Sequence, residues 1–142
     1  MITYRKFVSK DVITVQALAL KAWLFAYKSI YTKKNVIKMV LNYYSKNNLQ
    51  ETLIQIKKGK EQFIVAIEKT KLRGYAHIGK KNKTWELFRI YVDPKILGKG
   101  IGSGLLILIE QFLKSKGATK YCAHPHAKNP IAIQFYVKKG FK

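Results

Sequence analysis

The chain has 142 residues, of which 48% are hydrophobic and 13% aromatic. That length suits a single domain over residues 1–142, and the apolar fraction argues against intrinsic disorder. One cysteine, Cys122, excludes an intrachain disulfide and is compatible with a reducing cytoplasm. No run approaches the roughly 18 apolar residues of a membrane helix, and the N-terminus lacks the apolar core of a signal peptide. We therefore expect a cytoplasmic protein.

Charge is the unusual property of the composition, because 28 Lys and Arg against 7 Asp and Glu give a net charge of +21. Such an excess favours an anionic partner, which a nucleic acid, a membrane surface or a phosphorylated ligand would supply. However, lysines are spread along the whole chain, arginines are scarce, and no helix-turn-helix, zinc-finger or RRM signature occurs. A lysine-rich solvated surface explains the charge equally well, and a nucleic-acid-binding module stays as an alternative function.

The predicted elements begin with a short strand at residues 2–7. A helix follows, which Ser9 would cap and which runs to about residue 27. Its apolar residues have helical spacing at Val12, Val15, Leu18, Ala19, Ala22 and Trp23. Two further helical stretches cover about 33–47 and about 49–58.

The hydrophobic pattern then changes to one typical of strands, over residues 62–68, 72–79 and 84–92. A glycine-rich segment opens an apolar helix over about 100–116, with Gly117 at its C′ position. A short strand at 120–123 precedes a last helix, which starts at Pro130 and ends near Gly140. This order of elements predicts an α/β sandwich around a central mixed sheet.

The densest chemical signal lies in residues 92–104. Three glycines alternate where the strand gives way to the helix: Gly98, Gly100 and Gly102. The first amides of a helix have no intrahelical partner and the dipole is positive there, so such a start binds phosphate oxygens. Lys99 adds a cation. The pattern is also that of a plain strand-to-helix turn, and it is not a G-x-G-x-x-G motif because Ser103 replaces the third glycine.

Two motifs around this loop resemble the GNAT superfamily of N-acetyltransferases. Residues 97–102 match the family's acetyl-CoA motif, Gln/Arg-x-x-Gly-x-Gly/Ala, at both glycines and depart from it at Leu97. Residues 129–141 contain the complete second signature, Asn-x-x-Ala-x-x-Phe-Tyr-x-x-x-Gly-Phe. The resemblance is strong over 62–142 and looser over 2–60.

This resemblance implies a three-layer α/β (α+β) fold whose central mixed sheet is mostly antiparallel. GNAT domains usually continue past the Gly-Phe pair into a final strand, whereas this chain stops at Lys142. We therefore expect the final strand to be missing. A short sheet edge needs a cover, which a second subunit of a homodimer would provide.

The resemblance also implies which residues bind acetyl-CoA. Main-chain amides of the loop would hold the pyrophosphate, so the departure at Leu97 costs one polar side-chain contact. Backbone groups of Ile90 and Val92 would face the pantetheine arm, and the Val92 amide would donate to the oxyanion. Asn129 would contact CoA, although an N-cap role is equally expected. The predicted cofactor-binding residues are Ile90, Tyr91, Val92, Leu97, Gly98, Lys99, Gly100, Ile101, Gly102, Ser103 and Asn129, and Lys99, Lys138 and Lys139 would meet phosphates.

Direct attack of a neutral amine on the thioester needs a base for the amine and an acid for the leaving thiolate. Tyr136 matches the family's general acid; a core aromatic residue is the alternative. It shares one helix face with Asn129 and Ala132. Glu86 lies eleven residues before Leu97, the offset at which some GNAT enzymes place a base that acts through a water. The alternative for Glu86 is an exposed strand carboxylate. Asp93, which precedes a proline, is expected to stabilise the turn.

Cys122, His124 and His126 occupy alternate positions and would share one face of a strand. Cysteine and histidine at that spacing could bind zinc. Pro125 interrupts that strand and the sequence offers no evident fourth ligand, so no metal site is predicted.

The predicted function is acetyl-CoA-dependent transfer of an acetyl group to a primary amine of a small molecule or peptide. A GNAT-fold protein that binds CoA without catalysis is the other alternative. Residues 22–31, with Trp23, Tyr27 and Tyr31, look similar to the polyamine-acetyltransferase subgroup. A protein of net charge +21 repels a polycation, however, unless its cleft is locally acidic.

Overall fold

The computed structural model describes residues 1–124 and 129–141. The elements, in chain order, are β1 (Ile2–Lys6), the 3-10 turn η1 (Ser9–Asp11), α1 (Val12–Ala26), α2 (Lys33–Tyr43), α3 (Lys46–Lys57), β2 (Glu61–Glu68), β3 (Lys71–Lys81), β4 (Thr84–Val92), the 3-10 turn η2 (Pro94–Ile96), α4 (Ile101–Ser115), β5 (Cys122–Ala123) and α5 (Pro130–Lys138). Among the described helices, none combines the length and the apolar character that crossing a membrane requires.

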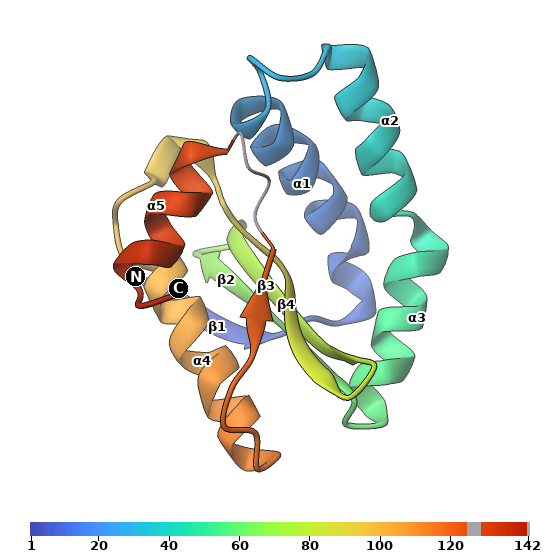
Figure 1. The fold of residues 1–142 in the computed structure, drawn as a ribbon. Helices are drawn as coiled ribbons and strands as arrows, with labels where there is room; N and C mark the ends of the chain where they lie inside the picture. Colours follow the sequence, from blue (N-terminus) through green and yellow to red (C-terminus); the bar gives the residue numbers. More distant parts are fainter. Residues whose placement is uncertain (125–128, 142) are drawn as a thin grey trace.

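The five strands form one sheet in the order β1-β2-β3-β4-β5 (Figure 1). Strands β1 to β4 are antiparallel neighbours, and β5 runs parallel to β4. The sheet is therefore mixed and mostly antiparallel, as the resemblance implied. Within the described residues, β1 and β5 are its edges.

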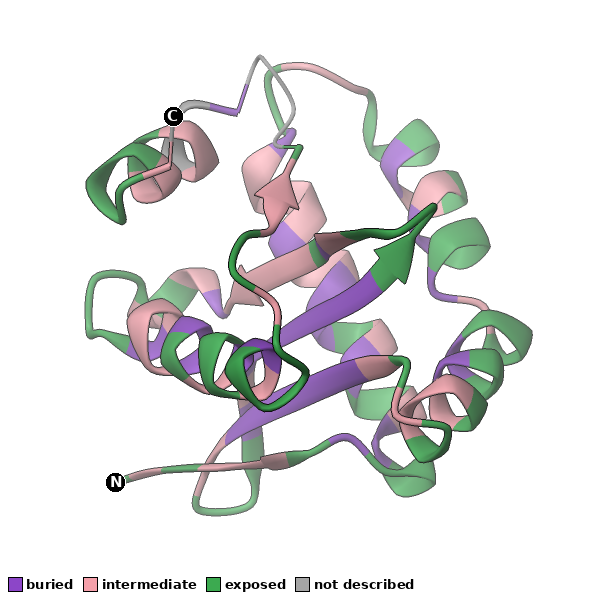
Figure 2. Ribbon diagram, turned by 60° about the horizontal axis from the view of Figure 1, so that its bottom comes forward, coloured by how far each residue is buried: buried purple, intermediate pink, exposed green. Residues whose placement is uncertain are grey.

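Helices cover both faces of this sheet and give the molecule three layers (Figure 1). Helices α1, α2 and α3 lie on one face, and α4 and α5 lie on the other. Alternate strand residues point to opposite faces. Phe63 and Val65 accordingly belong to the core under α1–α3, whereas Ile64 and Ala66 belong to the core under α4. Figure 2 shows the buried strands between helices whose outer faces are exposed.

The predicted cap at Ser9 is wrong, because Asp11 occupies the N-cap position of α1, where its side chain caps no amide of that helix. Ser9 lies inside the turn η1, and the Asp11 carboxylate accepts a hydrogen bond from the Val8 N–H at 2.9 Å. The Arg5 guanidinium donates to both Asp11 oxygens, at 2.7 and 2.8 Å. Burial alone would raise the pKa of Asp11, but the Arg5 pair and the Val8 N–H lower it. This pair joins β1 to the start of α1.

The helix predicted over 33–47 ends early, because a second N-cap follows it. Ser45 Oγ accepts from the Asn48 N–H at 3.1 Å and starts α3. Thr32 Oγ1 accepts from the Asn35 N–H in the same way at the start of α2. The strand predicted at 120–123 shortens to Cys122–Ala123, which pairs with Glu86 and Leu87 of β4.

Candidate active site

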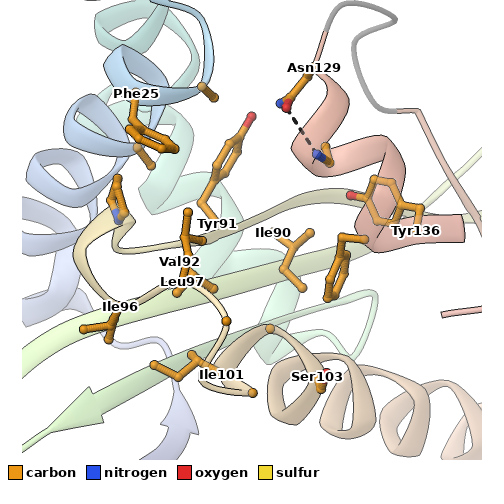
Figure 3. A pocket seen from close by; sticks show the side chains of 18 of the residues that line it. Phe25, Ile90, Tyr91, Val92, Ile96, Leu97, Ile101, Ser103, Asn129 and Tyr136 are labelled. Carbon is orange, nitrogen blue, oxygen red and sulfur yellow. Dashed lines mark hydrogen bonds between the residues drawn. The ribbon is translucent and has the colours of Figure 1, made fainter. Parts of the chain in front are cut away.

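A cavity of about 350 Å³ opens where α1, the end of β4, the start of α4 and α5 meet (Figure 3). That volume lies within the usual range of small-molecule sites. Its lining residues are Ala22, Phe25, Ala26, Ile90, Tyr91, Val92, Pro94, Ile96, Leu97, Gly98, Gly100, Ile101, Gly102, Ser103, Asn129, Ala132, Phe135, Tyr136, Lys138 and Lys139. Of the predicted cofactor-binding residues, all but Lys99 line it, and Lys99 is exposed beside the loop.

The loop that enters α4 has a left-handed backbone at Gly98 and Gly100, each with a φ of +82°. An added Cβ would meet nothing within 4 Å at either position. These glycines are therefore required by the backbone conformation and not by a lack of space, since residues with a Cβ are strained at such φ values.

The start of α4 presents unpaired amides to the cavity. The Gly104 N–H donates to the Gly100 carbonyl at 3.0 Å, which is the first hydrogen bond of the helical ladder. The amides of Ile101, Gly102 and Ser103 precede it and belong to the first turn, which has no intrahelical acceptors. With the positive end of the helix dipole, they form a site that fits the phosphate oxygens of CoA.

Gly102 allows α5 to approach α4. A Cβ on Gly102 would lie 3.1 Å from Cε1 of Phe135, which is closer than ordinary packing allows. The Phe135 ring therefore lies against the first turn of α4, and α5 forms a wall of the cavity. Phe135 was not predicted as a site residue, although its place before Tyr136 in the Phe-Tyr pair was a usable signal.

Tyr136 lines the cavity, and its hydroxyl points into the open space (Figure 3). Its ring packs against those of Phe135 and Phe141, with centroid distances of 5.7 and 5.1 Å. Burial raises the pKa of Tyr136 to about 12, and the nearby Tyr27 phenol adds to the effect. The hydroxyl is therefore protonated at neutral pH and able to donate a hydrogen bond.

Asn129 caps α5. Its Oδ1 accepts from the Ala132 N–H at 3.2 Å, as the dashed line in Figure 3 marks, and the residue is buried. Asn129, Ala132 and Tyr136 all line the cavity, so the predicted shared helix face is confirmed. A contact between Asn129 and CoA stays a prediction.

Glu86 lies in β4 opposite Cys122 of β5 and is not among the residues that line the cavity. Its Oε1 lies 3.0 Å from Nε2 of His124. The catalytic role of Glu86 stays a prediction. His126, which the sequence placed beside His124, lies outside the described residues.

Asp93 stabilises the turn after β4, as predicted. Its Oδ1 accepts from the Lys95 N–H at 3.0 Å, and its carboxylate lies 2.9 Å from the Lys21 ammonium and 2.8 Å from the Arg73 guanidinium. Burial alone would raise the pKa of Asp93, but the Lys95 N–H and the two cations lower it to about 2. One buried carboxylate thus joins α1, β3 and η2 next to the cofactor loop.

The sequence did not single out Phe25 and Ala26 of α1 as site residues. Ala22, Phe25 and Ala26 line the cavity at i, i+3 and i+4 spacing, which is equally typical of a helix face packed into a core. Lys138 and Lys139 also line it, and their contact with phosphates stays a prediction. None of the lining residues carries a carboxylate.

The model of the Acetyltransferase (GNAT) family matches residues 21–141, which include the loop, both motifs and the C-terminal part of α1. The chain belongs to the GNAT family. A spermidine N(1)-acetyltransferase from Thermoplasma acidophilum is 28% identical to it, over 99% of this chain and 88% of that protein.

Two solved GNAT structures show the same fold. The PaiA N-acetyltransferase of T. acidophilum, crystallised with coenzyme A, has a TM-score of 0.94 and 28% identity, over 100% of this chain and 90% of that one. A GNAT acetyltransferase from Staphylococcus aureus has a TM-score of 0.81 and 17% identity, over 100% and 85% of the two chains. The chain is thus an N-acetyltransferase that binds acetyl-CoA and transfers its acetyl group to an amine.

Proposed function

We propose that this GNAT enzyme acetylates a small primary amine with little positive charge beyond the amine that reacts. The chemistry of the cavity carries the proposal. Its α1 wall is apolar and aromatic, with Phe25 beside Tyr91 of β4 in Figure 3, and its polar groups include two lysines but no carboxylate.

The carboxylates of the chain lie outside this cavity, and each has another partner. The pairs are Asp11 with Arg5, Glu51 with Gln55, Glu61 with His77, Glu68 with Arg73, Glu86 with His124, Asp93 with Lys21 and Arg73, and Glu110 with Tyr121. A polyamine such as spermidine, after which the relative is named, would therefore bring extra positive charges into a cavity that offers no counter-ion.

Positive charge around the site also lowers the pKa of the acceptor amine. An alkylamine with a pKa near about 10.4 is neutral in roughly one molecule in a few thousand at pH 7. The net charge of +21 around the cavity disfavours the ammonium form and lowers the pKa of a bound amine, whereas Lys138 and Lys139 are assigned to the phosphates of acetyl-CoA. The same field repels a second positive charge, so it favours a monoamine over a polyamine.

We assign the stabilisation of the leaving CoA thiolate to Tyr136. The amine nitrogen bonds to the carbonyl carbon, the carbon–sulfur bond breaks, and the electron pair stays on the sulfur. The Tyr136 hydroxyl, with its pKa of about 12, donates a hydrogen bond to that thiolate. Complete proton transfer to a thiolate whose conjugate pKa is about 8.5 is uphill by roughly three orders of magnitude, so the thiol gains its proton later. Glu86 stays the predicted acceptor of the amine proton, which would reach it through a water. The Val92 amide stays the predicted hydrogen-bond donor to the oxyanion.

Steady-state release of free CoA with a panel of acceptors tests the acceptor class. We expect kcat/KM for an arylalkyl monoamine, such as phenethylamine, to exceed that for spermidine by at least about tenfold. A preference for spermidine would refute the proposed acceptor class and leave the acetyltransferase activity standing. If no amine were acetylated although calorimetry showed acetyl-CoA binding, the alternative of CoA binding without catalysis would hold instead.

A further inference from the structure

Three side chains with metal-binding atoms meet where β4 and β5 pair. Glu86 lies directly opposite Cys122 in the parallel ladder, so both side chains lie on the same face of the sheet. His124 follows Cys122 by two residues along the extended chain and returns to that face. This group, which we call the Glu86 triad, consists of Glu86, Cys122 and His124, and it lies outside the cofactor cavity.

The distances from His124 to Glu86 and to Cys122 are close to those of a metal coordination shell. Nε2 of His124 lies 3.0 Å from Oε1 of Glu86 and 3.6 Å from Sγ of Cys122, and all three ligand atoms lie within 4.8 Å of one another. In a tetrahedral zinc site, bonds of about 2.3 Å to sulfur and about 2.0–2.1 Å to nitrogen and oxygen separate S from N by about 3.5 Å, and N from O by about 3.3 Å. The N–O and S–N distances that involve His124 are therefore within a few tenths of an ångström of those in a zinc site, and the Glu86 oxygen and the Cys122 sulfur lie within 4.8 Å of each other.

We propose that the Glu86 triad binds zinc or a similar divalent transition metal. A thiolate, an imidazole and a carboxylate are ligands that zinc takes, whereas magnesium and calcium take oxygen ligands. Binding requires the thiol to release its proton to solvent and to leave the Trp85 carbonyl, 3.7 Å away, to which it now donates. The thiolate and the carboxylate then balance the double charge of the ion.

Access to the site is open on the His124 side. The His124 side chain is 72% exposed, whereas that of Glu86 is 18% exposed. Three protein ligands leave a fourth position for water, as in zinc sites that are not purely structural. A bound ion would also hold the carboxylate that we predict as the catalytic base. The metal-binding proposal does not rest on that catalytic role.

Titration of the reduced full-length protein with Co²⁺, followed by absorption spectroscopy, tests the site. Cys122 is the single cysteine of the chain, so any sulfur-to-cobalt charge-transfer band must come from it. We expect that band, together with the visible bands of tetrahedral cobalt, to saturate at one ion per chain and to disappear when Zn²⁺ is added. Absence of the band, or saturation at one ion per two chains, would overturn the proposal.

Variants identify the other two ligands. We expect Cys122→Ser to abolish the charge-transfer band. His124→Ala and Glu86→Gln should each weaken Co²⁺ binding by more than the roughly 10–100-fold that loss of an outer-shell partner costs. Glu110→Gln, which removes an exposed carboxylate bonded to Tyr121, serves as the matched control and should titrate as the wild type does. Far-UV circular dichroism verifies that each variant is folded. An unchanged titration in both His124→Ala and Glu86→Gln would also overturn the proposal.

Discussion

The hydroxyl of Tyr136 is a single polar group at the end of a ring that packs on two other aromatic rings. Tyr136→Phe removes the donor and keeps this packing, so we expect kcat to fall by at least about 100-fold while the KM for acetyl-CoA changes little. Steady-state kinetics of CoA release measures both constants. Loss of a group that acts only in the transition state lowers kcat in this way, whereas damage to the cavity would raise KM.

A second tyrosine provides the control for this prediction. Tyr121 donates to Glu110 at 2.6 Å and does not line the cavity. Tyr121→Phe should therefore keep the wild-type kcat. If Tyr136→Phe were as active as Tyr121→Phe, the assignment of the thiolate donor to Tyr136 would be wrong.

Glu86 is a residue whose role depends on pH. If its carboxylate accepts the amine proton, Glu86→Gln lowers kcat/KM by about 10–100-fold near pH 7. The loss should shrink toward pH 10, because the neutral fraction of an amine with a pKa of about 10.4 has then risen to roughly 30% and hydroxide competes as the proton acceptor. The pH–rate profiles of wild type and variant measure this, with Glu110→Gln as a matched carboxylate control. Parallel profiles for Glu86→Gln and wild type would exclude Glu86 as the base.

At the scale of elements, Asp93 holds α1, β3 and η2 in place through the ion pairs and the turn described above. Asp93→Asn leaves two cations without their buried partner, so we expect the free energy of unfolding at pH 7 to fall by roughly 2–3 kcal/mol. The folded-state pKa of Asp93 is about 2, below the unfolded value of about 3.9. Its stabilisation is therefore complete above about pH 4 and disappears as the pH falls toward 2.

Denaturant unfolding of wild type and Asp93→Asn at several pH values checks this prediction. Glu51→Gln is the control, since Glu51 accepts from Gln55 on the exposed side of α3, and it should change stability little. A stability difference between wild type and Asp93→Asn that stays constant from pH 7 to 2 would contradict the role of the Asp93 charge.

His77 joins three strands of the sheet. The Arg89 Nε of β4 donates to Nδ1 of His77 at 3.2 Å, so the proton of the neutral ring is on Nε2, which donates to Glu61 of β2 at 2.7 Å. Burial lowers the pKa of His77 to about 4; the Glu61 contact opposes this shift and the Arg89 cation adds to it. The unfolded histidine, with a pKa near about 6.5, takes up its proton first as the pH falls.

Stability should therefore decrease from about pH 6.5 to about pH 4, by up to roughly 3 kcal/mol from this residue. His77→Gln offers a hydrogen-bond donor and an acceptor but does not titrate. The unfolding free energy of this variant should therefore lack the decrease that protonation of His77 causes. Urea unfolding of both proteins across that range measures the difference. If the two curves stayed parallel between pH 6.5 and 4, the neutral buried state of His77 would be disproved.

The elements also show what the sequence could predict. Strand alternation and helical spacing are local, so the element order and the mixed sheet followed from them. Which residue takes the N-cap position depends on neighbours elsewhere: Arg5 of β1 pairs with Asp11, and Asp11 rather than Ser9 directly precedes α1. The Glu86 triad could not be predicted, because it depends on the register of β4 against β5. The place of Phe25 in the cavity depends on how α1 docks on the sheet. A linear sequence pattern contains neither.

At the scale of the whole molecule, the cavity exists only where both helix layers reach the end of β4. Helix α1 contributes its wall from one face of the sheet, and α4 and α5 contribute theirs from the other (Figure 1). The net charge of +21 surrounds this junction, and the phosphates of acetyl-CoA are negative. Attraction between them weakens as salt is added, because the Debye length falls to about 10 Å at 0.1 M.

We therefore expect the KM for acetyl-CoA to rise with ionic strength. Most of this rise should come from screening of the lysines that line the cavity. The double variant Lys138→Gln and Lys139→Gln should raise KM several-fold at low salt and flatten its salt dependence, with a smaller effect on kcat. The matched control, Lys57→Gln with Lys58→Gln, removes the same charge from exposed positions at the end of α3, on the other face of the sheet, and should leave KM near the wild-type value. Equal effects of the two pairs would mean that the field of the whole surface, and not the lysines of α5, attracts the cosubstrate.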